Sequence, residues 1–355
     1  MRIGYVSNSE DLQHPADRRR LLTWATDNSV ELETSEPLTS DLLVLTNAAN
    51  FKYWIKRAEQ PVILDLVDGY LGENPRFLKD LIRNLVRTFG GTSSLSWITY
   101  TRHLKWACKM SAAVVVASEE QKQLVLPFNK NVHIILDDHS EVDSAILNSR
   151  KKNPDIHSDP EYPAIFWEGF GYTIKHFGFM AKQLDEFLNE FKGEMNLVTV
   201  EEFPRWGGYI GKIKTRNLIK KMFPLSWQSI KIIPWSLQNL ADTARASTLG
   251  IIPIQPDDHF ATMKSENKLL SMWHLGLPVI FSRIPAYLRT AKNAHSEVAA
   301  ISQDSWAISL RNISVDHIAL QLLQDKSSEY IKATHTREIL VRQWDSVIRG
   351  LIKRS

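Results

Sequence analysis

The chain has 355 residues, of which 43% are hydrophobic and 23% are charged, a composition typical of folded globular proteins that excludes an intrinsically disordered chain. A length of 355 residues exceeds what one hydrophobic core usually serves, and it predicts two domains. The 43 Lys and Arg against 40 Asp and Glu give a net charge of +3, too small to indicate a nucleic-acid partner, and we expect none.

Cysteine usage and hydropathy predict the compartment. Cys108 is the only cysteine, so intramolecular disulfides and Cys-based zinc sites are excluded and a reducing compartment is expected. The opening residues, Met1 to Arg20, lack the apolar core of a signal peptide. No apolar run approaches the roughly 20 residues that cross a bilayer. The sequence therefore predicts a cytoplasmic protein.

Short apolar strands alternate with helical stretches from the amino terminus onward. This rhythm is typical of βαβ units and predicts a parallel sheet with helices on both faces. Helical patterns lie at Phe77–Phe89 and Leu95–Met110. The strands predicted in this half are Arg2–Ser7, Asp41–Leu45, Pro61–Leu66, Ala112–Ala117 and Val132–Leu136.

The segment Ser149–Pro163 interrupts the rhythm, because it is polar, contains three prolines and lacks apolar periodicity. We interpret it as an interdomain linker. A second alternating series follows, with helices expected at Phe177–Phe191, Leu237–Ala246 and Glu266–Leu275. Its predicted strands are Ala164–Trp167, Asn196–Val200, Ile230–Ile233, Gly250–Ile254 and Val279–Phe281. The sequence thus predicts an α/β protein with Rossmann-like, doubly wound domains over residues 1–155 and 156–335, followed by a terminal helix over residues 336–355.

The stretch KSENKLLSMWHLGLPVIF begins at Lys264 and reads as loop, short helix, glycine stop and buried strand. Ser265 is the expected N-cap, and Gly276 can take the left-handed conformation that ends a helix. In an open α/β sheet, the loop before such a helix lies at the carboxyl ends of the strands, where ligands bind. Lys268 meets the positive helix start unfavourably, by roughly 0.3–1 kcal/mol. A bound phosphate would reverse that sign, whereas the alternative is a lysine that reaches into solvent.

PWSLQNLADTARASTLGIIPIQ and KSENKLLSMWHLGLPVIFSRIPAY resemble the second domain of GT-B glycosyltransferases, especially the family-four-like (glycosyl transferases group 1) enzymes. The matching positions are Pro234-Trp235, Ala246 to Pro253, Lys268 to Leu270, Gly276 to Val279 and Ile284-Pro285. This resemblance implies two Rossmann-like domains facing across a cleft. It also implies a nucleotide-sugar donor held chiefly by the second domain, an acceptor on the first domain and a last helix that crosses back to it.

The resemblance, together with the phosphate-binding property of a helix start, predicts which residues contact the donor. We expect donor contacts from Lys264, Ser265, Glu266, Lys268, Gly169, Lys175 and Trp235. The chain departs from the family at three positions. The paired glutamates are replaced by Met263 and Ser271, and the arginine after the first glycine of the second domain is replaced by Phe170. The identity of the donor is therefore left open.

DLQHPADRRR, beginning at Asp11, follows the first strand, where GT-B enzymes place the acceptor and the diphosphate. Glycosyl transfer needs the acceptor hydroxyl deprotonated and the departing phosphate stabilised. His14 or Asp17 is the candidate catalytic base, and Arg18 and Arg20 are candidate anion contacts. The alternative is that Pro15 and Asp17 begin a helix whose arginines face solvent. Asp68, at the end of the strand before Gly69, is a further candidate on the acceptor side, although Asp68-Gly69 is equally a good turn.

Asp137-Asp138-His139 and Asp257-Asp258-His259 look like metal-ligand clusters, but adjacent carboxylates point in different directions and neither cluster has helical ligand spacing. We expect no catalytic metal and no cofactor, since the nucleotide-sugar is a substrate. A peripheral membrane contact stays open. The terminal helix is basic and amphipathic, and it lies either on an anionic membrane or on its own protein. Residues 97–106 mix basic and aromatic groups and either hold a lipid-linked acceptor or form an ordinary amphipathic helix.

The predicted function is transfer of a sugar from a nucleotide-sugar to a saccharide or lipid-linked acceptor, in surface polysaccharide or glycolipid biosynthesis. The enzyme is expected to be metal-independent and cytoplasmic, with contact to the inner face of the membrane as an open possibility. Two alternatives remain: a non-catalytic, sugar-binding GT-B partner, and a nucleotide-sugar epimerase of the same fold. A dinucleotide oxidoreductase is disfavoured, because no strand is followed by Gly-x-Gly-x-x-Gly.

Overall fold

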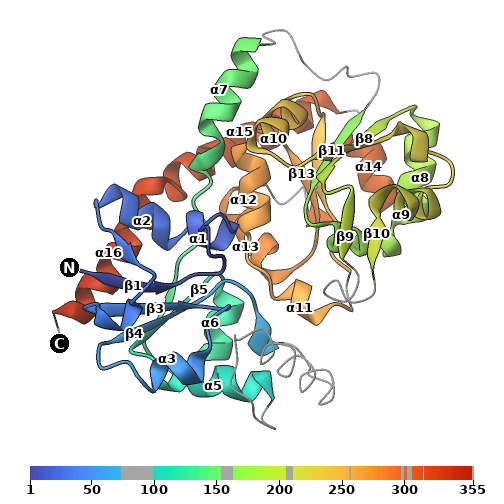
Figure 1. Cartoon of the computed structure of the whole chain (residues 1–355). Helices are drawn as coiled ribbons and strands as arrows, with labels where there is room; N and C mark the ends of the chain where they lie inside the picture. The colour runs from blue at the N-terminus through green and yellow to red at the C-terminus, as the bar shows by residue number, and fades with distance from the viewer. Residues whose placement is uncertain are drawn as a thin grey trace. The chain divides into compact units, whose positions relative to one another are not determined.

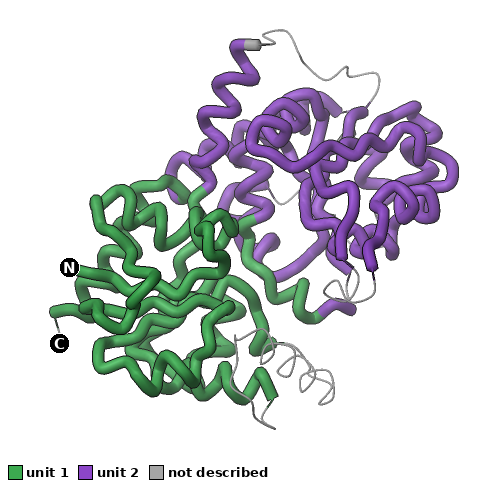
Figure 2. Tube along the Cα trace, viewed as in Figure 1, with its two compact units in different colours: residues 1–138, 259–267, 335–355 green, residues 139–258, 268–334 purple. Residues whose placement is uncertain are grey.

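The structure is a computed structural model of the whole chain, and it describes residues 1–72, 99–152, 163–204, 211–255, 257–296, 300–301, 306–314 and 316–353. The chain divides into two compact units (Figure 2). Unit 1 comprises residues 1–138, 259–267 and 335–355, and unit 2 comprises residues 139–258 and 268–334. The chain therefore passes between the units at four points.

Unit 1 is built on a six-stranded parallel sheet of order β2-β1-β3-β4-β5-β6 (Figure 1). Its strands are β1 (Ile3–Val6), β2 (Leu32–Glu33), β3 (Leu42–Thr46), β4 (Val62–Leu66), β5 (Ala113–Val116) and β6 (Val132–Ile134). The four inner strands are almost wholly buried, which is why they read as continuous apolar runs. Successive residues point to opposite faces. Leu42 and Val44 belong to one core cluster, whereas Leu43 and Leu45 belong to the other.

Helices cover both faces of this sheet. On one face α2 (Leu21–Asp27) lies beside α16 (Arg337–Ile352), and on the other α3 (Phe51–Ile55) lies beside α5 (Tyr100–Met110) (Figure 1). Among the described residues of unit 1, the other helical segments are α1 (Pro15–Arg18), η1 (Pro37–Thr39), η2 (Tyr70–Gly72), α6 (Glu119–Val125) and α11 (His259–Thr262). The apolar residues predicted on the terminal helix are all buried in the core of unit 1, namely Leu340, Trp344, Val347, Ile348 and Leu351. The apolar face of α16 is thus occupied by its own protein and is not available for a membrane.

Unit 2 has a second six-stranded parallel sheet, of order β11-β8-β7-β12-β13-β14, and an antiparallel pair β9-β10. Its strands are β7 (Ala164–Glu168), β8 (Glu194–Thr199), β9 (Glu202–Pro204), β10 (Lys212–Lys214), β11 (Ile230–Pro234), β12 (Leu249–Ile252), β13 (Val279–Ser282) and β14 (Ala300–Ile301). Its helical segments are η3 (Ser140–Val142), α7 (Asp143–Lys152), η4 (Gly171–Phe179), α8 (Ala181–Glu190), α9 (Thr215–Met222), η6 (Trp227–Ser229), α10 (Leu237–Arg245), α12 (Asn267–His274), α13 (Pro285–Asn293), α14 (Trp306–Ser314) and α15 (His317–Thr334).

Two glycines set the position of α12, the helix that carries Lys268. Gly250 lies in β12, and a Cβ there would meet the sulfur of Met272 at 2.9 Å, so the helix approaches the strand as closely as the chain allows. Gly276 has a φ of 83°, the left-handed conformation that ends a helix. The predicted stop is therefore confirmed, and α12 leads directly into the buried strand β13.

The predicted order of elements is confirmed at all ten predicted strands, and the α/β fold class with parallel sheets is confirmed. The short strands β2, β9, β10 and β14 were not predicted. The helix expected at Phe177–Phe191 begins instead as the 3₁₀ segment η4, and α8 starts only at Ala181. The helix predicted at Phe77–Phe89, residues 95–98 of the next one and most of the predicted linker lie outside the described residues.

The boundary predicted at residue 155 is wrong, because the division falls between residues 138 and 139. Helix α7 packs on α10 in unit 2, where Arg245 donates to the carbonyl oxygen of Ser149 at 2.8 Å. The ring of His274 lies 2.7 Å from a carboxylate oxygen of Asp143 at the other end of α7. The terminal segment, residues 335–355, belongs to unit 1.

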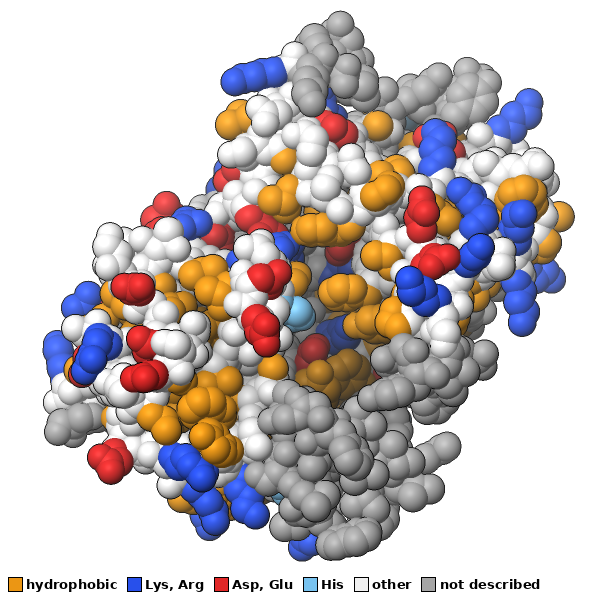
Figure 3. Space-filling view, in the orientation of Figure 1, with side chains coloured by type: hydrophobic (Ala, Val, Ile, Leu, Met, Phe, Trp, Pro, Cys, Tyr) orange, Lys and Arg blue, Asp and Glu red, His pale blue; other side chains and the backbone are white. Residues whose placement is uncertain are grey.

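Basic side chains are unevenly distributed over the surface. Figure 3 shows Lys and Arg gathering over the part of unit 2 that carries α8, α9 and β10. Lys212 and Lys214 lie in β10, and Lys220 and Lys221 lie in the last turn of α9. A small net charge is therefore compatible with a locally basic face. In the part of the chain that the structure describes, no helix is long and apolar enough to cross a membrane.

His335, at the return of the chain into unit 1, makes stability depend on pH. Burial lowers the pKa of His335 from its usual 6.5 to about 4. Between these values the unfolded chain takes up a proton that the folded protein does not, so the free energy of unfolding falls as the pH is lowered, by up to about 2–3 kcal/mol. Lowering the pH from 7.5 to 5 should reduce the melting temperature of His335→Gln by less than it reduces that of the wild type. The exposed His317 provides the control, since His317→Gln should follow the wild type. An equal loss in all three proteins contradicts the prediction.

Candidate functional site

The sheet order of unit 2 indicates where a ligand binds. From β7 the chain proceeds outward through β8 to β11, and from β12 it proceeds in the opposite direction through β13 to β14. The order therefore reverses between the neighbouring strands β7 and β12. Open parallel sheets bind ligands at such a switch point, outside the carboxyl ends of the strands. The relevant residues are those that follow Glu168 and Ile252.

A tight turn follows β7 at Gly169. Its N–H donates to the carbonyl oxygen of Val198 at 3.2 Å, and its carbonyl oxygen accepts from the hydroxyl of Thr199 at 2.6 Å. A Cβ at this position would lie 2.9 Å from the Trp167 ring and 3.0 Å from both the Lys268 Nζ and the Thr173 hydroxyl. Only glycine leaves space for these neighbours, which fits the predicted place of Gly169 in the site.

Lys268 lies in the first turn of α12, and its ammonium group reaches this turn. Its Nζ lies 3.9 Å from a carboxylate oxygen of Glu168 and 4.9 Å from the centroid of the Trp167 ring. The Lys268 side chain is 25% exposed. The alternative of a lysine that reaches into solvent is therefore wrong. The lysine amine and the amides at the start of the helix lie where the sheet order predicts an anion.

Two further predicted donor residues lie at the same edge of unit 2. Lys175, in η4, forms an ion pair with Asp258 at 2.9 Å, and both follow strands that meet at the switch point. The neighbouring His176 accepts a hydrogen bond from the backbone N–H of Gln255 at 3.3 Å, which ties η4 to the segment after β12. Trp235 directly follows β11 and is exposed. The edge therefore combines two lysines, two carboxylates and an accessible indole.

The segment before α12 belongs to unit 1. The helix begins at Asn267, so Glu266, and not Ser265, directly precedes it, and the prediction of Ser265 as the N-cap is wrong. Glu266 is buried, and Lys264 lies over the ring of Phe260, with Nζ 5.7 Å from the ring centroid. This segment packs on the loop after β4. A Cβ on Gly69 would meet the Cβ of Met263 at 2.9 Å.

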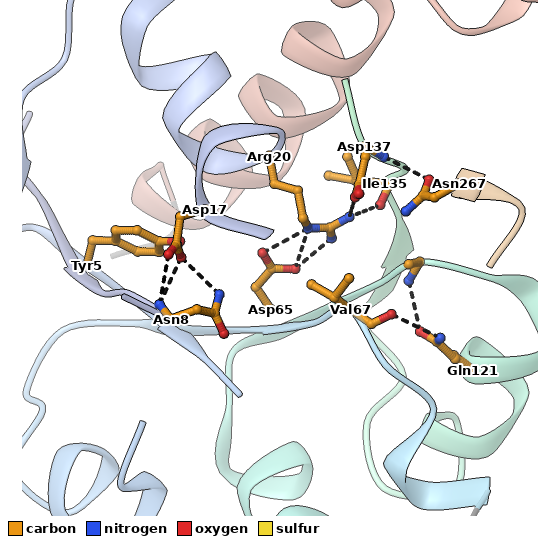
Figure 4. Close-up of polar contacts among 11 residues, drawn as sticks. Tyr5, Asn8, Asp17, Arg20, Asp65, Val67, Gln121, Ile135, Asp137 and Asn267 are labelled. Atoms are coloured by element: carbon orange, nitrogen blue, oxygen red, sulfur yellow. Dashed lines mark hydrogen bonds and ion pairs between the residues drawn. The ribbon is translucent and has the colours of Figure 1, made fainter. Parts of the chain in front are cut away.

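Asp17, predicted as a catalytic base, is fully buried and holds the loop after β1 (Figure 4). Its carboxylate accepts hydrogen bonds from the Tyr5 hydroxyl at 2.5 Å, from the backbone and side-chain nitrogens of Asn8 at 2.9 Å, and from the Ser9 N–H at 3.0 Å. A carboxylate with no exposed surface and this many donors does not reach a substrate. The catalytic role of Asp17 is therefore wrong, and its role is structural.

Arg20, predicted as an anion contact, is also fully buried. It pairs with Asp65 at 2.6 Å and with Asp137 at 3.2 Å, and it donates to the carbonyl oxygen of Ile135 at 2.6 Å (Figure 4). Burial raises the pKa of Asp137, and Arg20 opposes that rise. The Arg20 guanidinium is fully engaged by partners inside unit 1, so the predicted contact between Arg20 and a ligand is wrong.

His14 and Arg18 remain accessible on the same loop. His14 is the exposed N-cap of α1, and its Nδ1 accepts from the N–H of Ala16 at 3.2 Å. When the imidazole is neutral, this hydrogen bond places its proton on Nε2, which makes that nitrogen a hydrogen-bond donor toward a ligand. Arg18 donates to the carbonyl oxygen of Gln13 at 2.7 Å and is half-buried. A helix does begin at Pro15, as the alternative states, but its arginines do not all face solvent, because Arg18 is half-buried and Arg20 is fully buried.

Asp68, which follows β4, has an altered acidity. Burial raises the pKa of Asp68, while the charges of Lys264 and His14 and a hydrogen bond from Tyr70 oppose that rise. A carboxylate with a raised pKa is a better proton acceptor than one in water. Asp68 therefore has the raised proton affinity expected of a catalytic base, the role that the sequence analysis gave to Asp17. His14 is close enough to influence the pKa of Asp68.

The two Asp-Asp-His sequences are explained by ion pairs. Asp137 binds Arg20, Asp138 binds Arg337 at 3.2 Å, and Asp258 binds Lys175. Among the residues that the structure describes, no group of three His, Cys, Asp or Glu side chains is placed to hold a metal ion.

Similarity to known proteins was found at the level of structure. No family model matches the chain, and no curated protein matches its sequence. WaaG, described as a glycosyltransferase involved in lipopolysaccharide biosynthesis, is 12% identical with a TM-score of 0.60, over 98% of this chain and 99% of WaaG. A glycosyltransferase from Rickettsia africae is 14% identical with a TM-score of 0.57, over 99% of this chain and 84% of that protein. TarM is 9% identical with a TM-score of 0.56, over 86% of this chain but only 54% of TarM, so the chain spans about half of TarM's length.

The chain has the GT-B fold.

The structure shows the surroundings of the three residues that depart from the family pattern in this GT-B chain. Met263 stands where the first glutamate is expected, and it packs on the glycines of the loop after β4. Ser271 lies in the middle of α12 and is half-buried. Phe170 stands in place of the arginine; Lys268 reaches the Gly169 turn, and Lys175 lies further along η4 in its ion pair with Asp258.

Sequence reasoning missed several residues of this candidate site. Glu168, Thr173 and Thr199 all contact or flank the Gly169 turn. Glu168 directly follows the predicted strand Ala164–Trp167, and a carboxylate at a strand end was the available signal. Thr199 is the last residue of β8, which is inside the predicted strand Asn196–Val200. Nothing in the sequence distinguishes Thr173 from other loop threonines.

Proposed function

We propose that the protein is a glycosyltransferase that uses a nucleotide-sugar donor, with the donor phosphates bound by unit 2 at the Gly169 turn. One observation carries the proposal. The Lys268 amine lies against Gly169, a position of the turn where a side chain cannot fit, at the point where the strand order reverses. The GT-B fold supports it, because the solved structures with this likeness include enzymes described as glycosyltransferases.

The chemistry of transfer needs a group that stabilises the departing nucleoside diphosphate. Lys268 supplies a full positive charge, and the start of α12 supplies a partial one. Both act without moving, because the lysine is held between Glu168 and the Trp167 ring. On the acceptor side we propose Asp68 as the proton acceptor and His14 as a hydrogen-bond donor through Nε2, replacing the role first given to Asp17.

The finer features of the function are proposals as well. We propose a metal-independent enzyme that acts on a saccharide or lipid-linked acceptor in surface polysaccharide or glycolipid assembly. A cytoplasmic location with peripheral contact to the inner face of the membrane is part of this proposal. The basic face over α9 and β10 supports such a contact, because anionic lipids attract clustered lysines.

The test is a thermal-shift screen of the purified protein against UDP-, GDP-, ADP-, CMP- and dTDP-sugars, followed by measurement of free nucleotide release with each hit. A donor present at about 100 times its Kd should stabilise the folded protein by about 2.7 kcal/mol. We expect one nucleotide class to raise the melting temperature and to be released when acceptor extracts are added. No shift with any nucleotide-sugar contradicts the proposal.

A second candidate function is a non-catalytic GT-B partner that binds sugar. The packing of Met263 in the position of a donor-binding glutamate favours it. In that case a nucleotide-sugar or saccharide binds, but no nucleotide is released with any acceptor extract. Release of nucleotide by the pure protein excludes this candidate.

A further inference from the structure

Two aromatic side chains next to the Gly169 turn are strongly exposed. Phe170 is 56% exposed and Tyr172 is 58% exposed. Their rings are stacked, with centroids 5.7 Å apart and planes only 6° from parallel. The pair therefore presents an exposed aromatic surface to solvent at the carboxyl end of β7. Neither ring takes part in the phosphate chemistry described above.

The backbone beneath this pair is fixed in spite of its exposure. The carbonyl oxygen of Phe170 accepts from the N–H of Thr173 at 2.8 Å and from its hydroxyl at 2.7 Å. A Cβ on Gly171 would lie 2.2 Å from the ring of Phe203, so the buried Phe203 supports the turn directly from below. Such a rigid support means that a ligand does not have to order the loop when it binds.

The row of exposed apolar residues continues across the sheet. Glu168 pairs in register with Val198, and Thr199 with Pro234, so Phe170, Val200 and Trp235 follow three neighbouring strands at the same level. Val200 and Trp235 are both exposed. Neighbouring strands lie about 5 Å apart, which places Trp235 roughly 10 Å along the edge from Phe170. This row is long enough for more than one ring of a ligand.

The charged groups around the stacked pair occur in ion pairs, and the exposed ring faces themselves suit a neutral part of a ligand. Lys268 is balanced by Glu168, and Lys175 is balanced by Asp258. The Glu168 carboxylate is only partly buried and accepts hydrogen bonds, so it suits a partner rich in hydroxyl groups. A sugar ring has both required properties, because its C–H face packs on an aromatic ring while its hydroxyls donate to a carboxylate. A lipid chain would be unfavourable here, because its apolar groups would lie against the four charged side chains of these two ion pairs.

We propose that Phe170 and Tyr172 form a stacking platform for a pyranose ring and that Trp235 extends it, so that unit 2 binds a saccharide chain in addition to the donor. Saccharide binding itself does not depend on catalysis. Its role as part of the acceptor site rests on the proposed function, and it selects a saccharide as the acceptor over a bare lipid phosphate.

The test is saturation-transfer NMR of the full chain, without nucleotide, with trisaccharides of glucose, galactose, mannose and N-acetylglucosamine as probes. We expect transfer to at least one trisaccharide, and a Kd about tenfold or more higher in the Phe170→Ala/Tyr172→Ala double variant. Tyr172→Phe keeps the ring and should bind like the wild type. Tyr53→Ala removes an exposed aromatic residue of unit 1 and is the matched control.

The outcomes separate this proposal from the proposed function. The platform is overturned if no trisaccharide shows transfer, if the double variant retains the wild-type Kd, or if the double variant loses nucleotide binding instead of saccharide binding. If a trisaccharide binds as expected while no nucleotide-sugar does, the proposed function fails and the platform stands. If the enzyme transfers sugar and the double variant keeps the wild-type acceptor KM, the function stands and the platform fails.

Discussion

Arg20→Leu should destabilise the protein by about 3–5 kcal/mol, the cost typical of removing one partner from a buried ion pair. Arg20 has no exposed surface, and its removal leaves the buried carboxylate of Asp65 without its ion-pair partner and takes away the larger of the positive charges that act on Asp137. Urea unfolding measures the effect. The folded variant would hold at least one carboxylate with a raised pKa, so its deficit should grow as the pH rises above about 4 and shrink in acid.

Arg18→Leu is the matched control for this prediction. Arg18 lies two residues away in the same arginine run, but it is accessible and contacts a backbone carbonyl. Its replacement should change the free energy of unfolding by about 0.5 kcal/mol or less. The double variant Arg20→Leu/Asp65→Leu should recover part of the lost stability, because both buried charges are then removed. Equal stability of the Arg20 and Arg18 variants would show that the buried ion pairs do not stabilise unit 1.

Lys268→Met should lower kcat/KM for the nucleotide-sugar selected by the thermal-shift screen by about 10²- to 10³-fold, as expected when one fixed electrostatic partner of a transition state is removed. The loss should be much larger than the loss of stability. The ion pair with Glu168 is long, at 3.9 Å, and partly exposed, so we expect a change in unfolding free energy of about 1 kcal/mol or less.

Lys182→Met is the control for this prediction, since Lys182 also pairs with a glutamate at 3.9 Å but lies on the exposed face of α8. Its activity should equal that of the wild type. Glu168→Gln should leave donor binding intact or improve it, because it removes a negative charge beside the proposed phosphate site. If Lys268→Met is as active as Lys182→Met, the phosphates bind elsewhere.

Much of the fold could be predicted from the sequence for a simple physical reason. Strands buried on both faces carry apolar residues at nearly every position, so β4 and β5 are visible as short continuous runs. The position of Lys268 was predictable because Gly276 and Pro278 define the end of its helix. The short strands β9 and β14 carry no such run, and the boundary at residue 138 depends on packing of α7 that has no local signal.

The roles predicted for Arg20 and Asp17 were wrong because the sequence shows that these residues are charged but does not show whether they are buried. Arg18, Arg19 and Arg20 are consecutive, and only the bend between α1 and α2 turns the third one inward. One signal was available, because Asp65 interrupts the apolar run of β4 and a buried carboxylate needs a cation. Asp17 gave no comparable signal, since its hydrogen-bond donors come from the loop after β1 and from Tyr5.

Unit 1 is built from three separate segments of the chain, and this has a consequence for how the protein folds during synthesis. Its core includes Trp344 and Ile348, which belong to the last helix, whereas all segments of unit 2 precede that helix. On the ribosome, unit 2 can therefore complete its core first, while the face of the unit 1 sheet that α2 and α16 share is still only partly covered. Domains usually fold in the order of their synthesis. In this protein the unit that is begun first is finished last, and its nascent sheet depends on protection until residues 337–352 have emerged.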